Sequence, residues 1–151
     1  LTSSGPSVIE YNVRFGDPEA EVVLPLIKTD LIDIVSAVME KKLGSLKLQY
    51  HDGFCAGVVL ASEGYPGDYK KGAVIEGDLG DTADSFVFHA GTKAENNQIV
   101  TSGGRVLCVS ALGKTLSEAI DATYHRVGKI RFDGMQYRTD IGKKGLLAMK
   151  K

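Results

Sequence analysis

The 151-residue chain has the length of one ordinary domain, and its 43% hydrophobic content excludes a disordered or collagen-like protein. Its 18 basic and 19 acidic residues give a formal net charge of −1, which argues against binding of nucleic acid through overall charge. The longest apolar stretch, residues 22–27, is far too short to cross a membrane. Cys55 and Cys108 both lie in apolar runs, which favours buried free thiols and fits a cytoplasmic protein.

The first predicted element is a strand over residues 7–14, where apolar and polar side chains alternate. Its polar face carries Glu10, Asn12 and Arg14. A carboxylate and a carboxamide oxygen at this spacing suit a hard cation such as Mg²⁺, and a nearby arginine suits a phosphate. A solvated polar face explains the same alternation, and the spacing alone favours that simpler interpretation.

Two helices are predicted next. Asp17 is a good N-cap for the first helix and Pro18 a good first residue, while Pro25 must keep this helix short. The second helix begins at Asp30 or Thr29 and carries an apolar stripe at helical spacing.

Gly44 is expected to end the second helix, and the sequence after it changes to short β-branched and apolar segments. We therefore predict a boundary there, with parts at residues 1–43 and 44–151. The second part is expected to be α+β, with one main helix that Thr115 and Glu118 begin as a capping box. Its predicted strands cover residues 54–62, 74–76, 85–89, 98–101 and 105–111.

Three later segments carry polar groups that suit binding. The glycines within residues 62–69 would let backbone N–H groups approach an anion, although a tight loop is the simpler interpretation. His89 ends a predicted strand, and Arg138 offers a phosphate-sized donor that a surface ion pair with Asp140 explains equally well. The histidines lie too far apart in the sequence for a zinc motif, and the sequence contains no recognisable Ser-His-Asp or Cys-His signature of a hydrolase.

Together these segments resemble the glycinamide ribonucleotide synthetase family of ATP-grasp ligases, also called phosphoribosylamine–glycine ligases. Residues 9–19, I-E-Y-N-V-R-F-G-D-P-E, are similar to the signature near the C-terminal end of the family's ATP-grasp domain. The resemblance covers essentially the whole chain in the family's order. Its other segments are V-V-L-A-S-E-G-Y-P-G-D-Y at 58–69, V-F-H-A-G-T at 87–92, S-G-G-R-V-L at 102–107 and Y-R-T-D-I-G at 137–142.

The resemblance implies an α+β fold in which a strand and helices from the end of an ATP-grasp domain precede a small antiparallel sheet domain. It implies that the chain is the C-terminal portion of a purine-biosynthesis enzyme, which joins glycine to 5-phosphoribosylamine through an acyl phosphate. ATP is the implied co-substrate and Mg²⁺ or Mn²⁺ the implied metal. The implied enzyme is cytoplasmic and needs neither nucleic acid nor a membrane.

Matching the motifs residue by residue assigns roles to individual side chains. Glu10 and Asn12 match the family's metal ligands, and Arg14 would neutralise the transferring phosphoryl group. Asp17 and Glu19 are implied to orient the glycine ammonium or to shape the loop. The implied substrate-binding residues are Gly64, Tyr65, Pro66, Gly67 and Arg138, with His89 and Arg105 as weaker candidates.

The family's complete ATP clamp and its glycine-rich phosphate loop have no counterpart in this sequence. We therefore expect the remaining N-terminal lobes of the same enzyme as partners, and no ligase activity from the chain alone. Two alternatives stay open: another ATP-grasp ligase or carboxylase, and a non-catalytic interaction module. The tripeptide at 64–66 and the segment at 89–92 argue against another ATP-grasp enzyme.

Overall fold

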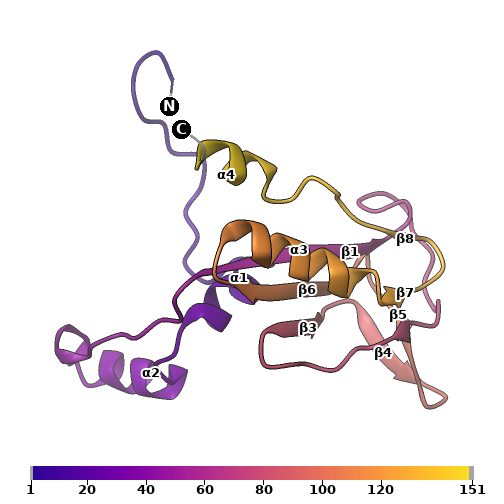
Figure 1. The fold of residues 1–151 in the computed structure, drawn as a ribbon, viewed down its shortest axis with the longest axis horizontal. Helices are drawn as coiled ribbons and strands as arrows, with labels where there is room; N and C mark the ends of the chain where they lie inside the picture. Colours follow the sequence, from indigo (N-terminus) through magenta and orange to yellow (C-terminus); the bar gives the residue numbers. More distant parts are fainter. Residues whose placement is uncertain (1, 150–151) are drawn as a thin grey trace.

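A computed structural model describes residues 2–149. Its centre is a four-stranded antiparallel sheet in the order β3-β6-β1-β8 (Figure 1). These strands are β1 (Phe54–Ser62), β3 (Ser85–His89), β6 (Arg105–Gly113) and β8 (Met135–Gln136). The long pair β1 and β6 runs from Phe54 opposite Gly113 to Ala61 opposite Arg105, with one shift in register after Leu60. The predicted α+β class is confirmed.

Two smaller antiparallel pairs complete the sheet structure: β2 (Glu76–Gly77) with β7 (Ile130–Arg131), and β4 (Thr92–Glu95) with β5 (Gln98–Thr101). The sequence does not predict β4, whose T-K-A-E segment has no apolar alternation. It forms because Asn96 and Asn97 adopt φ angles of 48° and 60°, the left-handed conformation of a two-residue hairpin turn. The predicted strand at 74–76 is reduced to a bridge between Val74 and Val100 before β2 begins.

The helix α3 (Leu116–Val127) covers one face of the sheet (Figure 1). Its predicted capping box is confirmed, since Thr115 Oγ1 accepts from the Glu118 N–H at 3.2 Å and Glu118 Oε2 accepts from the Thr115 N–H at 3.1 Å. Alternate residues of β1 are buried beneath this helix because successive strand side chains point to opposite faces. The main core cluster comprises Val58, Leu60, Ile75, Val87, Val106, Leu107, Val109, Val127, Ile130 and Phe132.

The opposite face of the sheet is only partly covered, by α1 (Ala20–Val23) and the 3₁₀ turn η1 (Leu24–Leu26). Val22 of α1 lies on Gly57 of β1, where an added Cβ would come within 2.6 Å of the valine Cγ1. Pro25 stands within η1, so the expectation that it limits the helix is confirmed.

The start of α1 differs from the prediction. Glu19 is the N-cap residue, and Asp17 and Pro18 precede the helix as part of a turn. The Gly16 N–H donates to the Glu19 carboxylate at 2.8 Å, so the side chain that accepts a backbone N–H at this turn is Glu19 and not Asp17.

The strand expected at residues 7–14 is wrong for this chain. The segment has no strand partner among residues 2–149 and runs away from the central sheet (Figure 1). The apolar side chains of the alternation are therefore exposed, Ile9 at 98% and Val13 at 96%. The pattern identified which residues share a face, but a strand also needs a neighbour to satisfy its backbone hydrogen bonds.

The second helix, α2 (Leu31–Met39), begins as predicted, with the Asp30 carboxylate accepting from the Ile32 N–H at 2.7 Å. Its predicted end at Gly44 is wrong. Lys41 adopts the left-handed conformation with φ of 58°. The Lys42 N–H donates to the Ala37 carbonyl and the Lys41 N–H to the Val38 carbonyl, and these two bonds form a Schellman motif. Gly44 instead lies in the 3₁₀ turn η2 (Leu43–Ser45).

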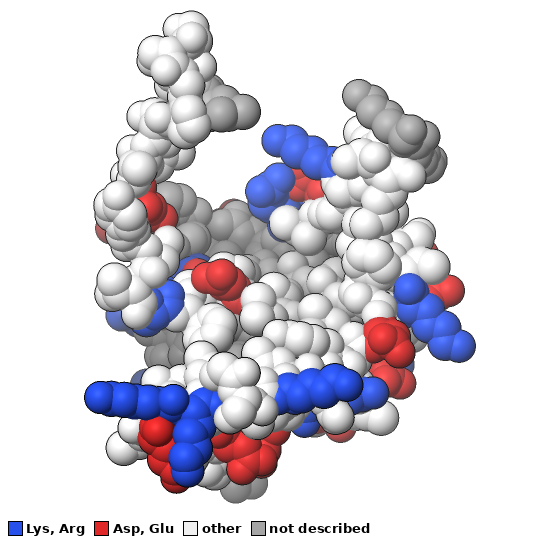
Figure 2. All heavy atoms as spheres, turned by 90° about the vertical axis from the view of Figure 1, so that its left-hand side faces the viewer, with Lys and Arg blue, Asp and Glu red and all other residues white. Residues whose placement is uncertain are grey.

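The last element is α4 (Lys143–Ala148). Residues 137–142 form a loop between β8 and α4. The N-terminal segment and α4 project on the same side of the body, with a hollow between them (Figure 2). Within residues 2–149 no helix has the length and apolar character needed to cross a membrane. The boundary at Gly44 stays a prediction.

Candidate functional site

The N-terminal motif places an acid and an amide side by side. Asn12 Nδ2 donates to Glu10 Oε1 at 3.2 Å, and both side chains are exposed. Arg14 bends back, so that its Nη1 donates to the Phe15 carbonyl at 2.9 Å. The predicted proximity of Glu10 and Asn12 is therefore present even without a strand. Oxygen donors of this kind are those that a hard divalent cation takes.

Asp17 and Glu19 make structural contacts at the end of the motif. Glu19 holds the Gly16 N–H, as described above. Arg105 Nη1, from the first residue of β6, donates to the Asp17 carbonyl at 2.7 Å and lies 3.3 Å from Asp17 Oδ1. This double contact attaches the motif to the edge of a pocket on the sheet.

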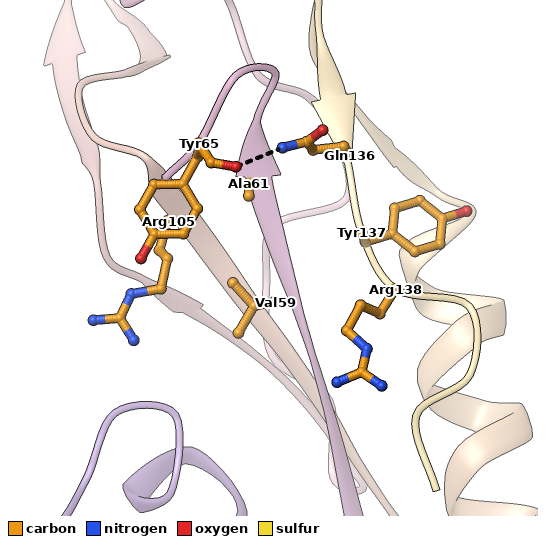
Figure 3. A pocket seen from close by; sticks show the side chains of 7 residues that line it. All are labelled: Val59, Ala61, Tyr65, Arg105, Gln136, Tyr137 and Arg138. Atoms are coloured by element: carbon orange, nitrogen blue, oxygen red, sulfur yellow. Dashed lines mark hydrogen bonds between the residues drawn. The ribbon is translucent and has the colours of Figure 1, made fainter. Parts of the chain in front are cut away.

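The pocket has a volume of about 410 Å³ and lies on the sheet face opposite α3 (Figure 3). Its floor is formed by Val59 and Ala61, the half-buried positions of β1 that alternate with the core residues. The residues that line it are Val59, Ala61, Tyr65, Arg105, Gln136, Tyr137 and Arg138.

One rim of this pocket is fixed by close packing and by an amide. The Tyr65 ring lies directly against Gly104, where any added Cβ would overlap the ring. Gln136 Nε2 donates to the carbonyls of Ser62 at 3.1 Å and Tyr65 at 3.4 Å, so β8 is tied to the turn after β1. The tyrosine ring is thereby held over the sheet.

The opposite rim carries Arg138, an exposed side chain that pairs with Asp140. Its Nε and Nη2 donate to the two carboxylate oxygens of Asp140 at 2.9 and 2.8 Å. This pairing raises the pKa of Arg138 and lowers the pKa of Asp140. Tyr124 of α3 supports the loop, since its hydroxyl donates to the Arg138 carbonyl at 2.7 Å and accepts from the Ile141 N–H at 3.1 Å.

The structure brings together some of the predicted substrate-binding residues. Tyr65 and Arg138 line the same pocket, and Arg105, a weaker candidate, lies between them and the N-terminal motif. The Tyr65 N–H donates to the Ser62 carbonyl at 3.1 Å, and the Gly67 N–H donates to the Gly64 carbonyl at 2.7 Å. Because these two N–H groups bond within the loop, the loop contributes the Tyr65 ring to the pocket.

Other candidates lie elsewhere. Gly64 borders a neighbouring hollow of about 620 Å³ that also contains Lys70 and Asp133. His89 Nδ1 is 3.0 Å from Thr92 Oγ1, and His89 is not among the residues that line the first pocket.

Gln136 and Tyr137 line the pocket without having been singled out by the sequence. Tyr137 stands inside the Y-R-T-D-I-G segment, so its neighbour Arg138 was an available signal. Gln136 had no such signal, because its role depends on the pairing of β8 with β1. Val59 and Ala61 follow from strand alternation, which places them on the face opposite the core.

The two thiols are free, as expected, with Cys108 buried and Cys55 partly buried. Burial, with smaller contributions from Glu21 and Asp17, raises the pKa of Cys108 to about 12. Burial also raises the pKa of Cys55. Both thiols therefore remain protonated near neutral pH and do not act as nucleophiles there.

Comparison with known proteins gives a consistent result. Residues 55–144 match the family model described as the C domain of phosphoribosylglycinamide synthetase. The phosphoribosylamine–glycine ligase of Caldanaerobacter subterraneus is 50% identical over 141 residues, which is 93% of this chain and 34% of that protein. The trifunctional purine biosynthetic protein adenosine-3 of Gallus gallus is 47% identical over 94% of this chain and 14% of its own length.

A solved structure agrees with the sequence matches. The crystal structure of phosphoribosylamine–glycine ligase from Thermotoga maritima superposes with a TM-score of 0.73 at 37% identity, covering 93% of this chain and 34% of that one. The chain thus spans about a third of the length of its bacterial relatives.

Proposed function

Because the chain belongs to the family of the phosphoribosylglycinamide synthetase C domain, we propose that it works as the C-terminal part of a phosphoribosylamine–glycine ligase. The proposed reaction joins glycine to 5-phosphoribosylamine and converts ATP to ADP and phosphate, as a step of purine biosynthesis in the cytoplasm. The observation that carries the proposal is the identity to ligases of this name along nearly the whole chain.

Glu10 and Asn12 are the residues that would hold Mg²⁺ or Mn²⁺ in this proposal. Their side chains lie in contact and offer a carboxylate and a carboxamide oxygen, the donors that such hard cations prefer. Among residues 2–149 there is no group of three or more histidine, cysteine and acidic side chains placed to hold a metal. Two protein oxygens fit Mg²⁺, an ion that binds few protein ligands, and the bound ion would supply positive charge beside the nucleotide phosphates.

The chemistry proposed for the chain's own residues is positioning and charge neutralisation. The glycine carboxylate attacks the γ-phosphate of ATP to give an acyl phosphate, and the amine of phosphoribosylamine then displaces phosphate from the activated carbonyl. The exposed guanidinium of Arg14 would neutralise charge on the transferring phosphoryl group. Asp17 and Glu19 would keep the motif in shape through their contacts with Arg105 and Gly16.

Phosphoribosylamine would enter from the side of the pocket that Tyr65 and Arg138 line. The contact between Arg105 and Asp17 places that pocket next to the motif proposed for phosphoryl transfer. A short path between the two is what the second step needs, because the amine must reach the acyl phosphate before water does.

The ATP clamp would come from further polypeptide of the same enzyme. The exposed apolar residues of the N-terminal segment and of α2, among them Ile9, Val13 and Ile32, would pack against it. We therefore propose that the chain on its own has no ligase activity.

The test is an assay of ADP release by the full-length protein that carries this chain. We expect release to require both glycine and phosphoribosylamine, and the Glu10→Gln variant to lose turnover. Glu40→Gln is the matched control, because Glu40 is an exposed glutamate whose contact is a surface ion pair with Lys42 at 2.8 Å. ADP release that needs bicarbonate or a different amine would instead indicate another ATP-grasp enzyme, and no release in any mixture would indicate a non-catalytic module.

A further inference from the structure

We propose that residues 78–84, called here the edge strap, close the outer edge of β3 against pairing with a second copy of this chain. The outer edge of β3 is a self-complementary surface for strand pairing, and the strap occupies it. Arg126 of α3 holds the strap in place from the buried side. The proposal concerns association between chains and does not depend on the ligase reaction.

Strand β3 is the outer strand of the central sheet, and within residues 2–149 it pairs only with β6. Even-numbered residues of this segment bond to β6, as the Ala90 N–H does to the Val106 carbonyl at 3.0 Å. Because alternate residues of an antiparallel strand bond to the same neighbour, Ser85, Val87 and His89 turn their N–H and C=O groups outward. Such a row of backbone groups is a template for another strand.

The edge strap binds two of these outward groups. Asp81 Oδ1 accepts from the Val87 N–H at 2.9 Å, and the Thr82 N–H donates to the Ser85 carbonyl at 2.8 Å. Figure 1 shows the segment that leads into β3 running alongside this strand, on the side away from β6. A second strand would have to displace both bonds before it could pair with β3.

Arg126 fixes the start of the strap to the body of the protein. Its side chain is 7% exposed, and its Nη1 donates to Asp78 Oδ2 at 2.6 Å while its Nη2 donates to the Gly80 carbonyl. Leu79, between these two contacts, packs against the main core cluster. Lifting the strap would leave a buried guanidinium without its partner, which is strongly unfavourable.

The composition of β3 and of the strap explains why a cover is needed and how it works. The S-F-V-F-H sequence of β3 is aromatic and β-branched, the kind of segment that associates when its edge is open. An antiparallel pair of two β3 strands is symmetric about Val87, so a second copy is the partner that fits. Asp81 and Asp84 are exposed on the strap, and two approaching copies would bring these like charges together.

The first test is hydrogen exchange at the Val87 amide of the full-length protein, measured by mass spectrometry. Asp81→Ala removes the acceptor and should speed exchange by about tenfold or more, as for loss of a hydrogen bond to a charged group. Asp81→Asn is the matched control, because it retains an oxygen acceptor and should speed exchange by a smaller factor. Asp81 is exposed, so neither substitution disturbs the core.

The second test is sedimentation velocity of the same proteins over a range of concentrations. Because pairing requires the open strap, the apparent Kd for self-association should fall in Asp81→Ala by at least the factor seen in exchange. Arg126→Met, which keeps the apolar stem and removes the guanidinium, should also lower this Kd. Melting curves establish that each variant remains folded.

A lysine on β3 identifies the surface that associates. Adding Phe88→Lys to Asp81→Ala should abolish the added association, because a charge on an edge strand opposes pairing. Leu48→Lys, at an exposed leucine outside β3, is its control and should not abolish it.

The proposal is overturned if the Val87 amide exchanges no faster in Asp81→Ala than in Asp81→Asn. It is equally overturned if Asp81→Ala and the native protein associate to the same extent, or if the added association survives Phe88→Lys.

Discussion

Arg105 donates a hydrogen bond to the main-chain oxygen of Asp17 at 2.7 Å, across 88 residues of sequence. The same guanidinium lines the pocket on the open face of the sheet. One side chain therefore connects the motif that carries Glu10 and Asn12 with the pocket that Tyr65 and Arg138 line. This contact brings the two parts of the proposed site next to each other.

The first prediction concerns this contact. Arg105→Gln should lower the free energy of unfolding by less than about 1 kcal/mol, because the ion pair is partly exposed, with side-chain exposures of 39% and 50%. The same variant should lower kcat/KM for phosphoribosylamine by about tenfold or more, since a charged donor in the pocket is lost. Urea unfolding and steady-state kinetics on the full-length protein measure the two effects. A loss of activity no larger than that of Arg131→Gln, a control at an exposed arginine of β7, would contradict the role of Arg105.

The second prediction concerns the contact between Tyr65 and Gly104. Gly104→Ala places a methyl group where the tyrosine ring lies, so the ring must move or the backbone must shift. We expect destabilisation of about 1–3 kcal/mol, as for other overpacked sites, and a raised KM for phosphoribosylamine.

Gly44→Ala is the matched control for this substitution, because nothing lies within 4 Å of its added Cβ. Thermal unfolding and kinetics of the two alanine variants should therefore differ clearly. Equal stability and equal KM in both variants would show that the position of the Tyr65 ring does not matter.

The third prediction concerns Tyr124, which supports the loop of Arg138 from α3. Tyr124→Phe keeps the ring and removes the hydroxyl that bonds Arg138 and Ile141. The free energy of unfolding should fall by about 0.5–1.5 kcal/mol for each hydrogen bond lost, and KM should rise while kcat stays nearly unchanged. Tyr50→Phe, at an exposed tyrosine, serves as control. A fall in kcat with KM unchanged would argue that Tyr124 does not act through substrate binding.

The fourth prediction is a pH dependence that arises from Cys108. Its pKa is raised from 9.0 to about 12 in the folded chain, so the folded state retains the thiol proton in a range where the unfolded state loses it. The stability contributed by this thiol is therefore fully present below pH 9.0 and is lost as the pH rises toward about 12. The difference in unfolding free energy between the native chain and Cys108→Ala should shrink over that interval. A difference that stays constant with pH would contradict the raised pKa.

The fifth prediction concerns the chain without further polypeptide. Large apolar side chains are exposed on the N-terminal segment and on α2, including Ile9 at 98%, Ile32 at 74% and Met39 at 80%. We expect the isolated chain to self-associate in light scattering and to release no ADP. Ile32→Lys should reduce the association, whereas Ala37→Lys on the same helix is the control. A clean monomer with glycine-dependent ADP release would overturn the proposal that the ATP site needs further polypeptide.

Local signals were sufficient for much of the fold. Strand β1 and helix α3 were predicted closely because alternation and a capping box are properties of adjacent residues. The strand at residues 7–14 failed because a strand depends on a partner, and β4 was missed because its formation depends on the turn at Asn96 and Asn97. Local pattern therefore indicates which residues share a face more reliably than it gives the pairing of a strand or the end of a helix such as α2.

The same distinction between local and long-range information applies to the candidate site. Arg138 and Tyr65 were selected from motifs, and they do line one pocket. Gln136 and the bond between Arg105 and Asp17 were not predictable, because each joins segments far apart in the sequence. The roles assigned to Glu10, Asn12 and Arg14 stay predictions.

The decisive measurement uses glycine labelled with ¹⁸O in its carboxylate, incubated with phosphoribosylamine, ATP and Mg²⁺ and the full-length protein. Attack of the carboxylate on the γ-phosphate, followed by displacement by the amine, must leave one carboxylate oxygen in the inorganic phosphate. We predict that mass spectrometry finds one ¹⁸O in each phosphate released, and that the Glu10→Gln variant slows its appearance while Glu40→Gln does not. Unlabelled phosphate, or labelled phosphate formed equally fast with Glu10→Gln, would contradict the proposed ligase chemistry and the place of this chain in it.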